Sequence, residues 1–502
     1  MSSPLARLSS TLADAGLTAG GAVVSAVAGF ALVAVVAQGL GAAAMGVLAV
    51  CMGVSMILLQ IGKLGYDTAL VHLIPRLDHY GTTSQLRSLL RHACLPVLGF
   101  GIVVTVLGWV LAPYLAAGLL RGYDHDEATG ALRVMLLGQP VASLAAVLMA
   151  AARGLGHMLP LVALDQIAKP VLRLLGVAGV VLGGGDIWWV VAAWSLPQWL
   201  IFLGAAVNIV RLTRAAAPGG SSVSSRLRHD VRVFVRYRSV SSAVEVVGMN
   251  LGVLVVGAFA GAGAAGGYSV ASRLVLAGLL TMQAVRLAIA PGISRSLADH
   301  DNEVTESLHQ TSTSWIVLTA WPLYLLLIAY PGPVLSLFGA GFSDSAAVLV
   351  LLAAGSMVSV AAGNVQTVLL MGGLSRSYLF VAVASLVVNA GLALVLVGPL
   401  GATGVAVAAA FATVAENLAI VVVVRRRLAV RAFGQPVYRA CFASLVWIGA
   451  PALTLSVVSA FDIGLMSAAA TTGLLGFAAL VWRWRAWFGF SVEASPAVAV
   501  HG

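Results

Sequence analysis

The sequence predicts an all-α, polytopic membrane protein, and its composition, the length of its apolar runs and the placement of its charges each support this. The chain has 502 residues, of which 60% are hydrophobic and only 9% are charged, and its mean hydropathy is +1.01. Apolar runs of about 18 residues or more can cross a bilayer as helices. The runs here are continuous instead of alternating between apolar and polar residues, which favours helices over a membrane β-barrel.

About fourteen segments are long enough to span a membrane. The first follows Arg7 and is too long for the apolar region of a typical cleaved signal peptide, so we interpret it as a spanning helix. The approximate ranges are 16–38, 44–70, 92–115, 129–152, 159–182, 187–210, 239–260, 265–290, 310–330, 346–371, 377–397, 402–424, 439–460 and 464–482.

The basic residues between these segments fall almost entirely in alternate connections. The other connections are short or acidic, with Arg121 and Arg133 as exceptions. Arg and Lys concentrate in cytoplasmic loops, so the pattern predicts cytoplasmic termini and an even number of spans. It also accounts for the net charge of +10 without nucleic-acid binding. The basic connections and ends hold Arg7, Arg76, Arg87, Arg91, Arg153, Arg211 to Arg238, Arg295, Arg376, Arg425 to Arg439, Arg483 and Arg485.

The longest connection, 211–238, separates the first six segments from the rest. Its Pro-Gly-Gly-Ser-Ser core is typical of a flexible joint. After this core, Leu227, Val231 and Phe234 alternate with arginines, a pattern that suits a basic amphipathic helix on the membrane surface.

A weak internal repeat has an offset of about 220 residues. The stretch LGAAAMGVLAV (40–50) resembles GAGAAGGYSV (261–270), and GLGHMLPLVAL from Gly154 resembles GGLSRSYLFVAV from Gly372. Two copies of a six-helix unit would keep the same orientation and be related by an axis along the membrane normal. The predicted organisation is an N-lobe (1–210), a basic cytoplasmic linker (211–238), a C-lobe (239–424), a basic cytoplasmic loop (425–438), two further helices (439–485) and a cytoplasmic tail (486–502).

Five stretches in order along the chain resemble the polysaccharide-transport branch of the multidrug/oligosaccharidyl-lipid/polysaccharide exporter superfamily. They are LGAAAMGVLAV, LGYDTALVHLIPR (64–76), AGAAGGYSVASRL (262–274), PGPVLSLFGAGF (331–342) and LVVNAGLALVLVGPLGATGVAVAAAFATVAEN (386–417). The resemblance implies two six-helix lobes that face a central cavity lined by helices one, two, seven and eight. It further implies alternating access that carries an undecaprenyl-type lipid-linked sugar to the outer leaflet. Relatives often have Arg where this chain has His72.

Charged residues inside the spans are the candidate site residues, because burying a charge in a membrane is costly and such residues usually face a cavity or a partner. Lys63 and Asp67 are four residues apart and can pair. In the fifth span Asp165 can neutralise Lys169, which leaves Arg173 as a candidate for substrate binding or for a structural role.

Arg273 is the strongest candidate for substrate binding, because an arginine fork suits the pyrophosphate of the implied cargo. Arg286 is either a headgroup contact or a positive-inside anchor, and Lys63 and Asn250 complete the candidate substrate set. Candidates for ion coupling or charge balance are Asp67, Glu245 and Glu416. Small residues at four-residue spacing in the first helices of the two lobes predict close helix contacts; they include Gly21, Ser25, Gly29, Gly248 and Gly252.

We expect no catalytic residue, no cofactor and no metal site, and we expect Cys51, Cys94 and Cys441 to be free thiols. The partners are then a lipid-linked glycan, membrane lipids and a polymerase with glycosyltransferases, in a bacterial plasma membrane. Three alternatives remain open. They are a cation-coupled multidrug exporter of the same fold, a peptidoglycan-precursor flippase and a membrane glycosyl-transfer enzyme, the last disfavoured by short outer loops that are poor in polar residues.

Overall fold

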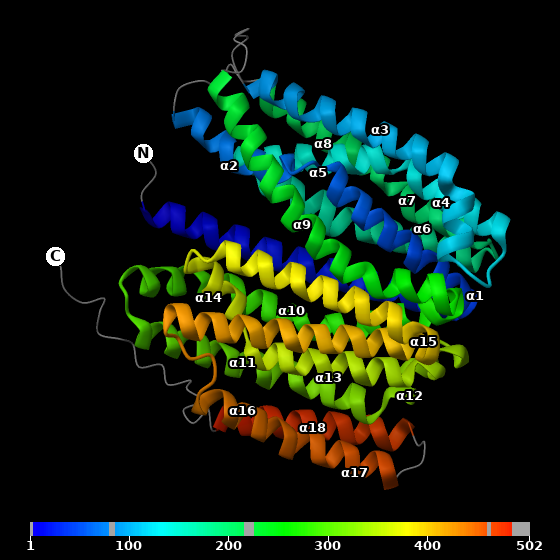
Figure 1. Cartoon of the computed structure of the whole chain (residues 1–502), viewed down its shortest axis with the longest axis vertical. Coiled ribbons are helices and arrows are strands. Elements are labelled where there is room, and N and C mark those ends of the chain that lie inside the picture. The colour runs from blue at the N-terminus through cyan, green and yellow to red at the C-terminus, as the bar shows by residue number, and fades with distance from the viewer. Residues whose placement is uncertain (1–3, 80–85, 215–224, 459–462, 484–502) are drawn as a thin grey trace. The chain divides into compact units, whose positions relative to one another are not determined.

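A computed structural model describes residues 4–79, 86–214, 225–458 and 463–483, and within them every regular element is a helix. The chain forms two compact units (Figure 1). Unit 1 comprises Met1–Val270, Leu337–Ser345 and Leu392–Val405. Unit 2 comprises Ala271–Ser336, Ala346–Gly391 and Ala406–Gly502.

Unit 1 holds the helices of the first half of the chain. They are α1 (Pro4–Gly62), α2 (Tyr66–His79), α3 (Leu86–Leu119), α4 (His125–Leu137), α5 (Gln139–Gly154), the π-helical stretch η2 (Leu161–Ala168), α6 (Lys169–Leu182), α7 (Ile187–Ser195), α8 (Pro197–Arg214) and α9 (Ser225–Ala260).

Unit 2 holds most of the second half, although three short pieces of that half belong to unit 1. Its elements are α10 (Ala262–Ala298), α11 (Asn302–Ala329), α12 (Pro331–Ser336), α13 (Ala346–Ala362), α14 (Val365–Met371), α15 (Ser375–Leu428), α16 (Gln435–Ser444), the π-helical stretch η4 (Leu445–Gly449), α17 (Ala450–Val458) and α18 (Ile463–Arg483). The 3₁₀ helix η3 (Ala340–Ser345) and the first residues of α10 belong to unit 1.

Ten helical stretches of the described residues are long and apolar enough to cross a membrane, which supports the predicted all-α membrane fold. Two of them are longer than one predicted span: Gly16–Gly62 contains the first predicted span and most of the second, and Ser375–Leu428 contains the spans 377–397 and 402–424. They bend at Gly41 (φ 80°) and Gly401 (φ 57°). The predicted span 159–182 is divided between η2 and α6, and the predicted span 464–482 corresponds to α18.

The structure departs from the predicted elements at several places. The predicted spans 129–152, 187–210, 346–371 and 439–460 are each divided between consecutive helical elements. The second predicted span, 44–70, is interrupted, because α1 ends at Gly62 and α2 begins at Tyr66. The basic stretch 225–238 is not a separate surface helix but the first part of α9, continuous with the seventh span. The Pro-Gly-Gly-Ser-Ser joint and the predicted tail from 486 lie outside the described residues.

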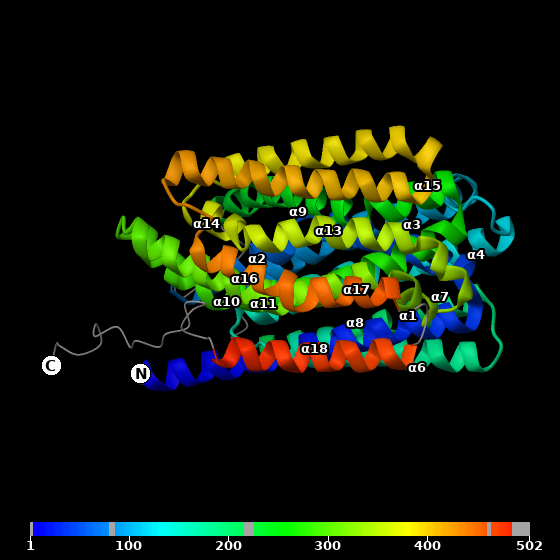
Figure 2. The same cartoon turned by 90° about the horizontal axis from the view of Figure 1, so that it is seen from below.

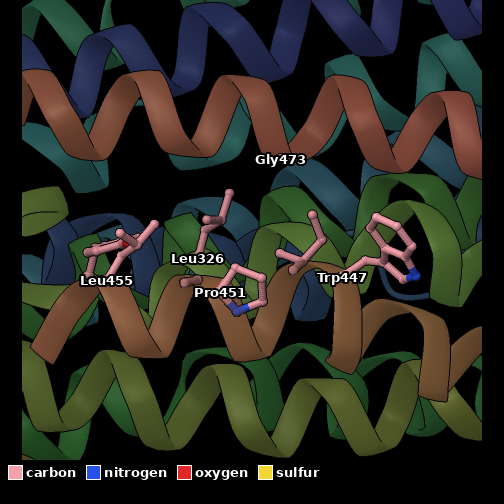
Figure 3. Close-up of a pocket in the computed structure, with 8 residues that line it drawn as sticks. Leu326, Trp447, Pro451, Leu455 and Gly473 are labelled. Atoms are coloured by element: carbon pink, nitrogen blue, oxygen red, sulfur yellow. The ribbon is translucent and has the colours of Figure 1, made fainter. Parts of the chain in front are cut away.

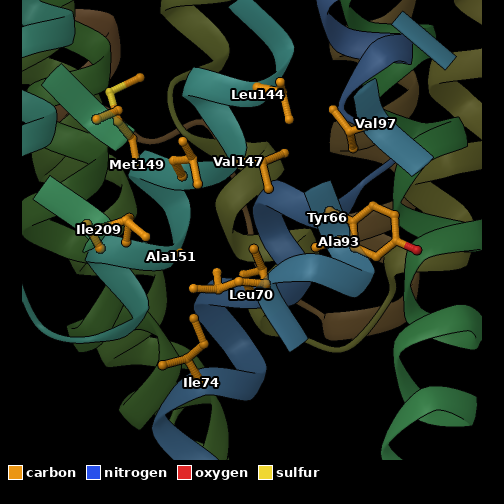
Figure 4. Packing of buried hydrophobic residues seen from close by; sticks show 14 of the residues in the cluster. Tyr66, Leu70, Ile74, Ala93, Val97, Leu144, Val147, Met149, Ala151 and Ile209 are labelled. Carbon is orange, nitrogen blue, oxygen red and sulfur yellow. The ribbon is translucent and has the colours of Figure 1, made fainter. Parts of the chain in front are cut away.

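Unit 1 has a dry core where α2, α3, α5 and α8 meet (Figure 4). Leu70 and Ile74 of α2 point toward Val147 and Ala151 of α5, and all four are at most 1% exposed. Tyr66, the first residue of α2, belongs to the same cluster. This packing holds α2 in place directly after the interruption of the second span.

Left-handed glycines reveal the internal repeat in three dimensions. Eight glycines with positive φ form four pairs that share an offset of about 220 residues. Because only glycine adopts this conformation without strain, each pair marks an equivalent turn. The pairs are Gly41 with Gly261, Gly122 with Gly339, Gly156 with Gly373, and Gly184 with Gly401.

Within unit 1, equivalent parts of α1 and α10 cross at two equivalent glycines. A Cβ built on Gly46 would overlap the carbonyl oxygen of Ala262, and one on Gly266 would overlap that of Ala42. Each glycine therefore allows the backbone of the other helix to approach closely, as small residues do between membrane helices. The two halves of this contact are related by the repeat, which makes it nearly twofold symmetric.

The C-terminal helices pack in unit 2, where α16 and α17 run alongside α11 (Figure 1, Figure 2). A cavity of about 30 Å³ lies among Leu326 of α11, Tyr330 just after that helix, Trp447 of η4, Pro451 of α17 and Gly473 of α18 (Figure 3). It is lined mostly by apolar side chains and is no larger than a water molecule, so it is a packing defect and not a ligand site.

Candidate functional site

Lys63 and Asp67 lie at the interruption of the second span. Between these two residues, Leu64 (φ 50°) and Gly65 (φ 77°) have left-handed conformations and interrupt the helix. The Tyr66 amide donates to the Lys63 carbonyl at 2.9 Å. The predicted ion pair is present: Lys63 Nζ lies 2.9 Å from Asp67 Oδ2, although the two residues straddle a turn and do not share one helix. Asp67, in the first turn of α2, also accepts from the Thr68 amide at 2.8 Å. The side chains are 15% and 17% exposed.

The fifth span carries the second predicted ion pair, between Asp165 of η2 and Lys169 of α6. Arg173 follows one turn later and is held by Trp194 of α7. Its Nε donates to the Trp194 carbonyl at 3.0 Å, and its guanidinium lies 3.8 Å from the centre of the Trp194 ring. A cation over an aromatic face is stabilised electrostatically, so Trp194 fixes the position of this charge.

These charges of the second and fifth spans form one cluster in unit 1. The segments η2 and α6 both pack on α1, and Lys169 interacts electrostatically with Lys63 and with Arg173. Three cations and two carboxylates give the cluster a net positive charge. We call these five residues, Lys63, Asp67, Asp165, Lys169 and Arg173, the cationic cluster.

The remaining candidates of unit 1 lie on α9. Asn250 is half-buried, donates to the Val246 carbonyl at 2.9 Å and packs beside Gly53 of α1. Glu245 is exposed. Close contacts at small residues are confirmed for Gly21, which lies against Gln166, and for Gly252, which lies against Tyr268.

Three candidates lie in unit 2. Arg273 and Arg286 are half-buried on α10, between three and four turns apart, and Glu416 is half-buried on α15. The structure therefore gathers the candidates of the second and fifth spans into one cluster, whereas these three residues belong to the other unit.

A second interruption, which the sequence did not lead us to single out, lies between α13 and α14. Gly363 (φ 65°) follows the end of α13, and Asn364 precedes α14. His309 of α11 is wholly buried here beside the Ala362 backbone. The sequence did contain a signal for His309: His92 occupies the equivalent position in the first repeat.

An exposed cavity of about 470 Å³ lies between the two halves of α15. Arg376, Arg426 and Arg427 line it together with apolar side chains such as Phe380 and Val423. None of the three arginines forms an ion pair with a described residue. Guanidinium groups beside apolar side chains are typical of contacts with anionic lipid headgroups.

The acidic stretch that starts at Asp124 begins a helix. Asp124 Oδ1 accepts from the amides of Asp126 at 3.0 Å and Glu127 at 2.9 Å, so it caps α4. Burial and then a hydrogen bond to Glu127 raise the pKa of Tyr123, which precedes this cap. Among the described residues no group of three His, Cys, Asp or Glu side chains is placed to hold a metal, and Cys51, Cys94 and Cys441 are free thiols.

Comparison with solved structures identifies the fold. A structure of the lipid II flippase MurJ in an inward closed conformation superposes with a TM-score of 0.72 at 13% identity, over 93% of this chain and 99% of that chain. An inward-facing multidrug resistance MATE family transporter gives a TM-score of 0.70 at 15% identity, over 81% of this chain and 95% of that chain. A superfamily transporter from Pyrococcus furiosus, with a binding pocket of reverse polarity, gives 0.57 at 15% identity, over 83% and 95%.

Sequence comparison adds the family. Curated protein sequences give no match to this chain. Residues 11–297 match the family described as polysaccharide biosynthesis protein, and this match covers more than half of the chain. The chain therefore belongs to the polysaccharide biosynthesis protein family, and it is a multi-pass membrane protein whose fold is similar to that of the MurJ and MATE transporters.

Proposed function

We propose that this protein is a flippase, and not an enzyme, that moves an undecaprenyl-type lipid-linked oligosaccharide across a bacterial plasma membrane. The cargo enters from the cytoplasmic leaflet, and alternating access delivers it to the outer leaflet. Both termini are cytoplasmic in this proposal, as the arginine-rich alternate connections predict. Polysaccharide polymerases and glycosyltransferases would act on the same lipid-linked glycan before and after its translocation.

The observation that carries the proposal is the positive balance of charge inside the spans. In the cationic cluster Lys63 is paired with Asp67 and Lys169 with Asp165, and Arg173 contacts the ring and the carbonyl of Trp194. The three cations of this partly buried cluster outnumber its two carboxylates. A pyrophosphate-linked sugar lipid is an anionic amphiphile, and a surplus of buried cations suits it better than a cationic drug.

Arg273 is the residue that we propose to contact the pyrophosphate. It is half-buried in the eighth span, and its guanidinium can present two parallel donors to phosphate oxygens. Arg286, Lys63, Arg173 and Asn250 are further proposed contacts for the cargo. Asp67, Glu245 and Glu416 are proposed to balance charge or to couple transport to an ion.

The test is translocation in proteoliposomes of a fluorescent polyprenyl-pyrophosphate oligosaccharide, followed by a quencher added outside. Wild type should flip the lipid, and Arg273→Ala should slow flipping about 10- to 100-fold, the range expected for losing hydrogen bonds to a charged group. Arg273→Lys should recover part of the rate. Arg133→Ala is the matched control, because Arg133 is a partly exposed arginine that rests on the Trp109 ring.

Two alternative cargoes are tested in the same vesicles. The likeness to the lipid II flippase MurJ, which spans nearly all of both chains, favours adding lipid II as a second cargo. Flipping of lipid II alone would move the proposal to a peptidoglycan-precursor flippase. If neither lipid moves but a cationic dye is exported, the multidrug exporter replaces the flippase.

A further inference from the structure

The interruption of the tenth span exposes backbone groups to a polar side chain of a neighbouring helix. The helix α13 ends at Ala362, and the Gly363 amide donates back to the Val360 carbonyl at 3.0 Å. The helix α14 restarts with the Thr367 amide donating to the Asn364 carbonyl at 2.9 Å. A helix end leaves carbonyls without intrahelical partners. The carbonyl of Ala362 is one of these, and it faces the imidazole of His309.

The side chains at this interruption are polar and almost fully buried. His309 and Thr313 are 0% exposed, and Asn364 is 1% exposed. The Thr313 hydroxyl donates to the His309 carbonyl at 2.7 Å and lies directly against Gly363. The Asn364 amide nitrogen donates to the Met282 carbonyl of α10 at 3.4 Å.

Three buried polar atoms at this place lack a hydrogen bond of normal geometry to any described residue. They are Nδ1 and Nε2 of His309 and Oδ1 of Asn364. Buried polar groups are nearly always paired, so a group of such atoms indicates a site whose hydrogen bonds change. A neutral imidazole has one donor and one acceptor, whereas a protonated imidazole has two donors.

The surroundings of His309 are neutral. The helices α13, α14 and α17 and the stretch η4 carry no Asp, Glu, Lys or Arg. Glu306, one turn before His309, is half-buried and accepts from the Arg431 amide at 2.7 Å. His309 forms no ion pair with a described residue. The other titratable or charged groups on elements of unit 2 around α11 are Arg273, Arg286, Arg295, Asp299, His300, Asp301, Glu303, Tyr324, Tyr330, Tyr438, Arg439, Cys441 and Arg483.

We propose that His309, with the Ala362 carbonyl and Asn364 Oδ1 at the α13–α14 interruption, is a proton-binding site that couples the transport cycle to a proton gradient. This deepens the proposed function and rests on it. The neutral imidazole takes one proton from water, and the resulting imidazolium donates to the Ala362 carbonyl and to Asn364 Oδ1. In transporters, unwound carbonyls and the ends of broken helices coordinate coupling ions in the same way.

Protonation alters the conformational balance because burial disfavours the charged form of His309. The proton therefore binds more tightly to a conformation in which the interruption is open to water, and it shifts the population toward that conformation. Asn364 links this event to α10, which carries both Arg273 and Arg286. Protonation of His309 can therefore affect α10, the helix that we propose to bind the cargo.

The internal repeat supplies a matched control. His92 lies on α3 at the position equivalent to His309, but it is exposed. Its neighbouring helix α5 is unbroken, with Ala146 and Val147 at the positions equivalent to Gly363 and Asn364. His92→Gln therefore removes an equivalent imidazole without touching an interruption.

The first test is hydrogen–deuterium exchange of the peptide around Gly363 in full-length protein in lipid vesicles, between about pH 5 and 8, where histidine titrates. After correction for the intrinsic chemistry, exchange in wild type should rise several-fold on acidification. His309→Gln should abolish this rise and His92→Gln should retain it. A rise that persists in His309→Gln, or none in wild type, overturns the proposal.

Asn364→Ala keeps the histidine and removes one acceptor of the charged form. The midpoint of the exchange transition should then move to lower pH, because a hydrogen bond to the imidazolium favours protonation. An unchanged midpoint in a folded Asn364→Ala variant contradicts the role assigned to Asn364. This variant keeps the proposal testable if His309→Gln does not fold.

The second test separates the proton site from the cargo. A pH gradient across proteoliposomes should change the flipping rate of the fluorescent oligosaccharide in wild type and in His92→Gln, but not in His309→Gln. If wild type does not flip this lipid while the exchange response depends on His309, the proposed cargo fails and the proton site stands. If wild type flips at a rate that no pH gradient alters, the flippase stands and the proton coupling fails.

Discussion

At both the Lys63–Gly65 and the Gly363–Asn364 interruption the chain turns at a left-handed glycine, but the side chains beside the first turn are charged and those beside the second are neutral. At Lys63–Gly65 in unit 1, the chain turns beside an ion pair whose members are 15% and 17% exposed. At Gly363–Asn364 in unit 2, the chain turns beside neutral polar groups that are at most 1% exposed. The first interruption carries its own counter-ion, and the second does not.

Comparison of the two repeats shows that neither interruption has a counterpart in the other repeat. Gly65 and Gly363 are the two left-handed glycines without a partner in the other repeat. The topology therefore does not require either interruption, since the equivalent helices α10 and α5 run through the corresponding positions. A paired charge stays ionised over a wide range of pH, whereas an imidazole that gains access to water can change its charge near neutrality. We therefore expect the first interruption to hold a fixed electrostatic field and the second to respond to protons.

The largest effect should follow substitution of Gly363 by alanine. Alanine at this position would need a left-handed backbone conformation, and its Cβ would overlap the Thr313 side chain. We therefore expect a loss of about 2–5 kcal/mol of stability. Thermal unfolding of the purified variant measures this loss. Gly373→Ala is the control, because Gly373 has a φ of 76° and open space around it, and strain alone should cost about 1–2 kcal/mol. Equal losses in both variants would mean that Thr313 does not pack tightly against the interruption.

A smaller effect should follow Asp67→Asn, which leaves Lys63 without its carboxylate in a mostly buried position. We expect a loss of about 1–3 kcal/mol, below the range for fully buried pairs because both side chains keep some contact with solvent. The double variant Lys63→Gln with Asp67→Asn should recover part of it, as a double-mutant cycle of thermal unfolding would measure. A double variant that loses the sum of the two single effects would show that the pair does not interact.

The smallest effect should follow Asn364→Ala, which removes the hydrogen bond from Asn364 to the Met282 carbonyl. The bond is long at 3.4 Å, so we expect a loss of about 0.5–1.5 kcal/mol in thermal unfolding. A loss larger than that of Gly363→Ala would contradict this expectation. It would mean that the tie to α10, and not the turn itself, stabilises the second interruption.

The apolar runs predicted the membrane fold, and the four-residue spacing predicted both ion pairs, because these features depend only on local sequence. The interruptions were harder to predict. Leu64 has a left-handed conformation for which its side chain gives no signal, and Gly363 lies within an apolar run that reads as one helix. The predicted ninth span, 310–330, begins one residue after His309. The polar run before it hid the fact that α11 already begins at Asn302 and that tertiary packing against α13 buries the histidine.

The glycine crossing at Gly46 and Gly266 has a consequence for substitutions in the two helices. Gly46 lies against the Ala262 carbonyl and Gly266 against the equivalent Ala42 carbonyl, so the two contacts mirror each other. A contact in which the same patch meets itself about a twofold axis is isologous. Alanine at either glycine should therefore disturb the same backbone approach, and the two substitutions should act on one shared contact instead of on two independent ones.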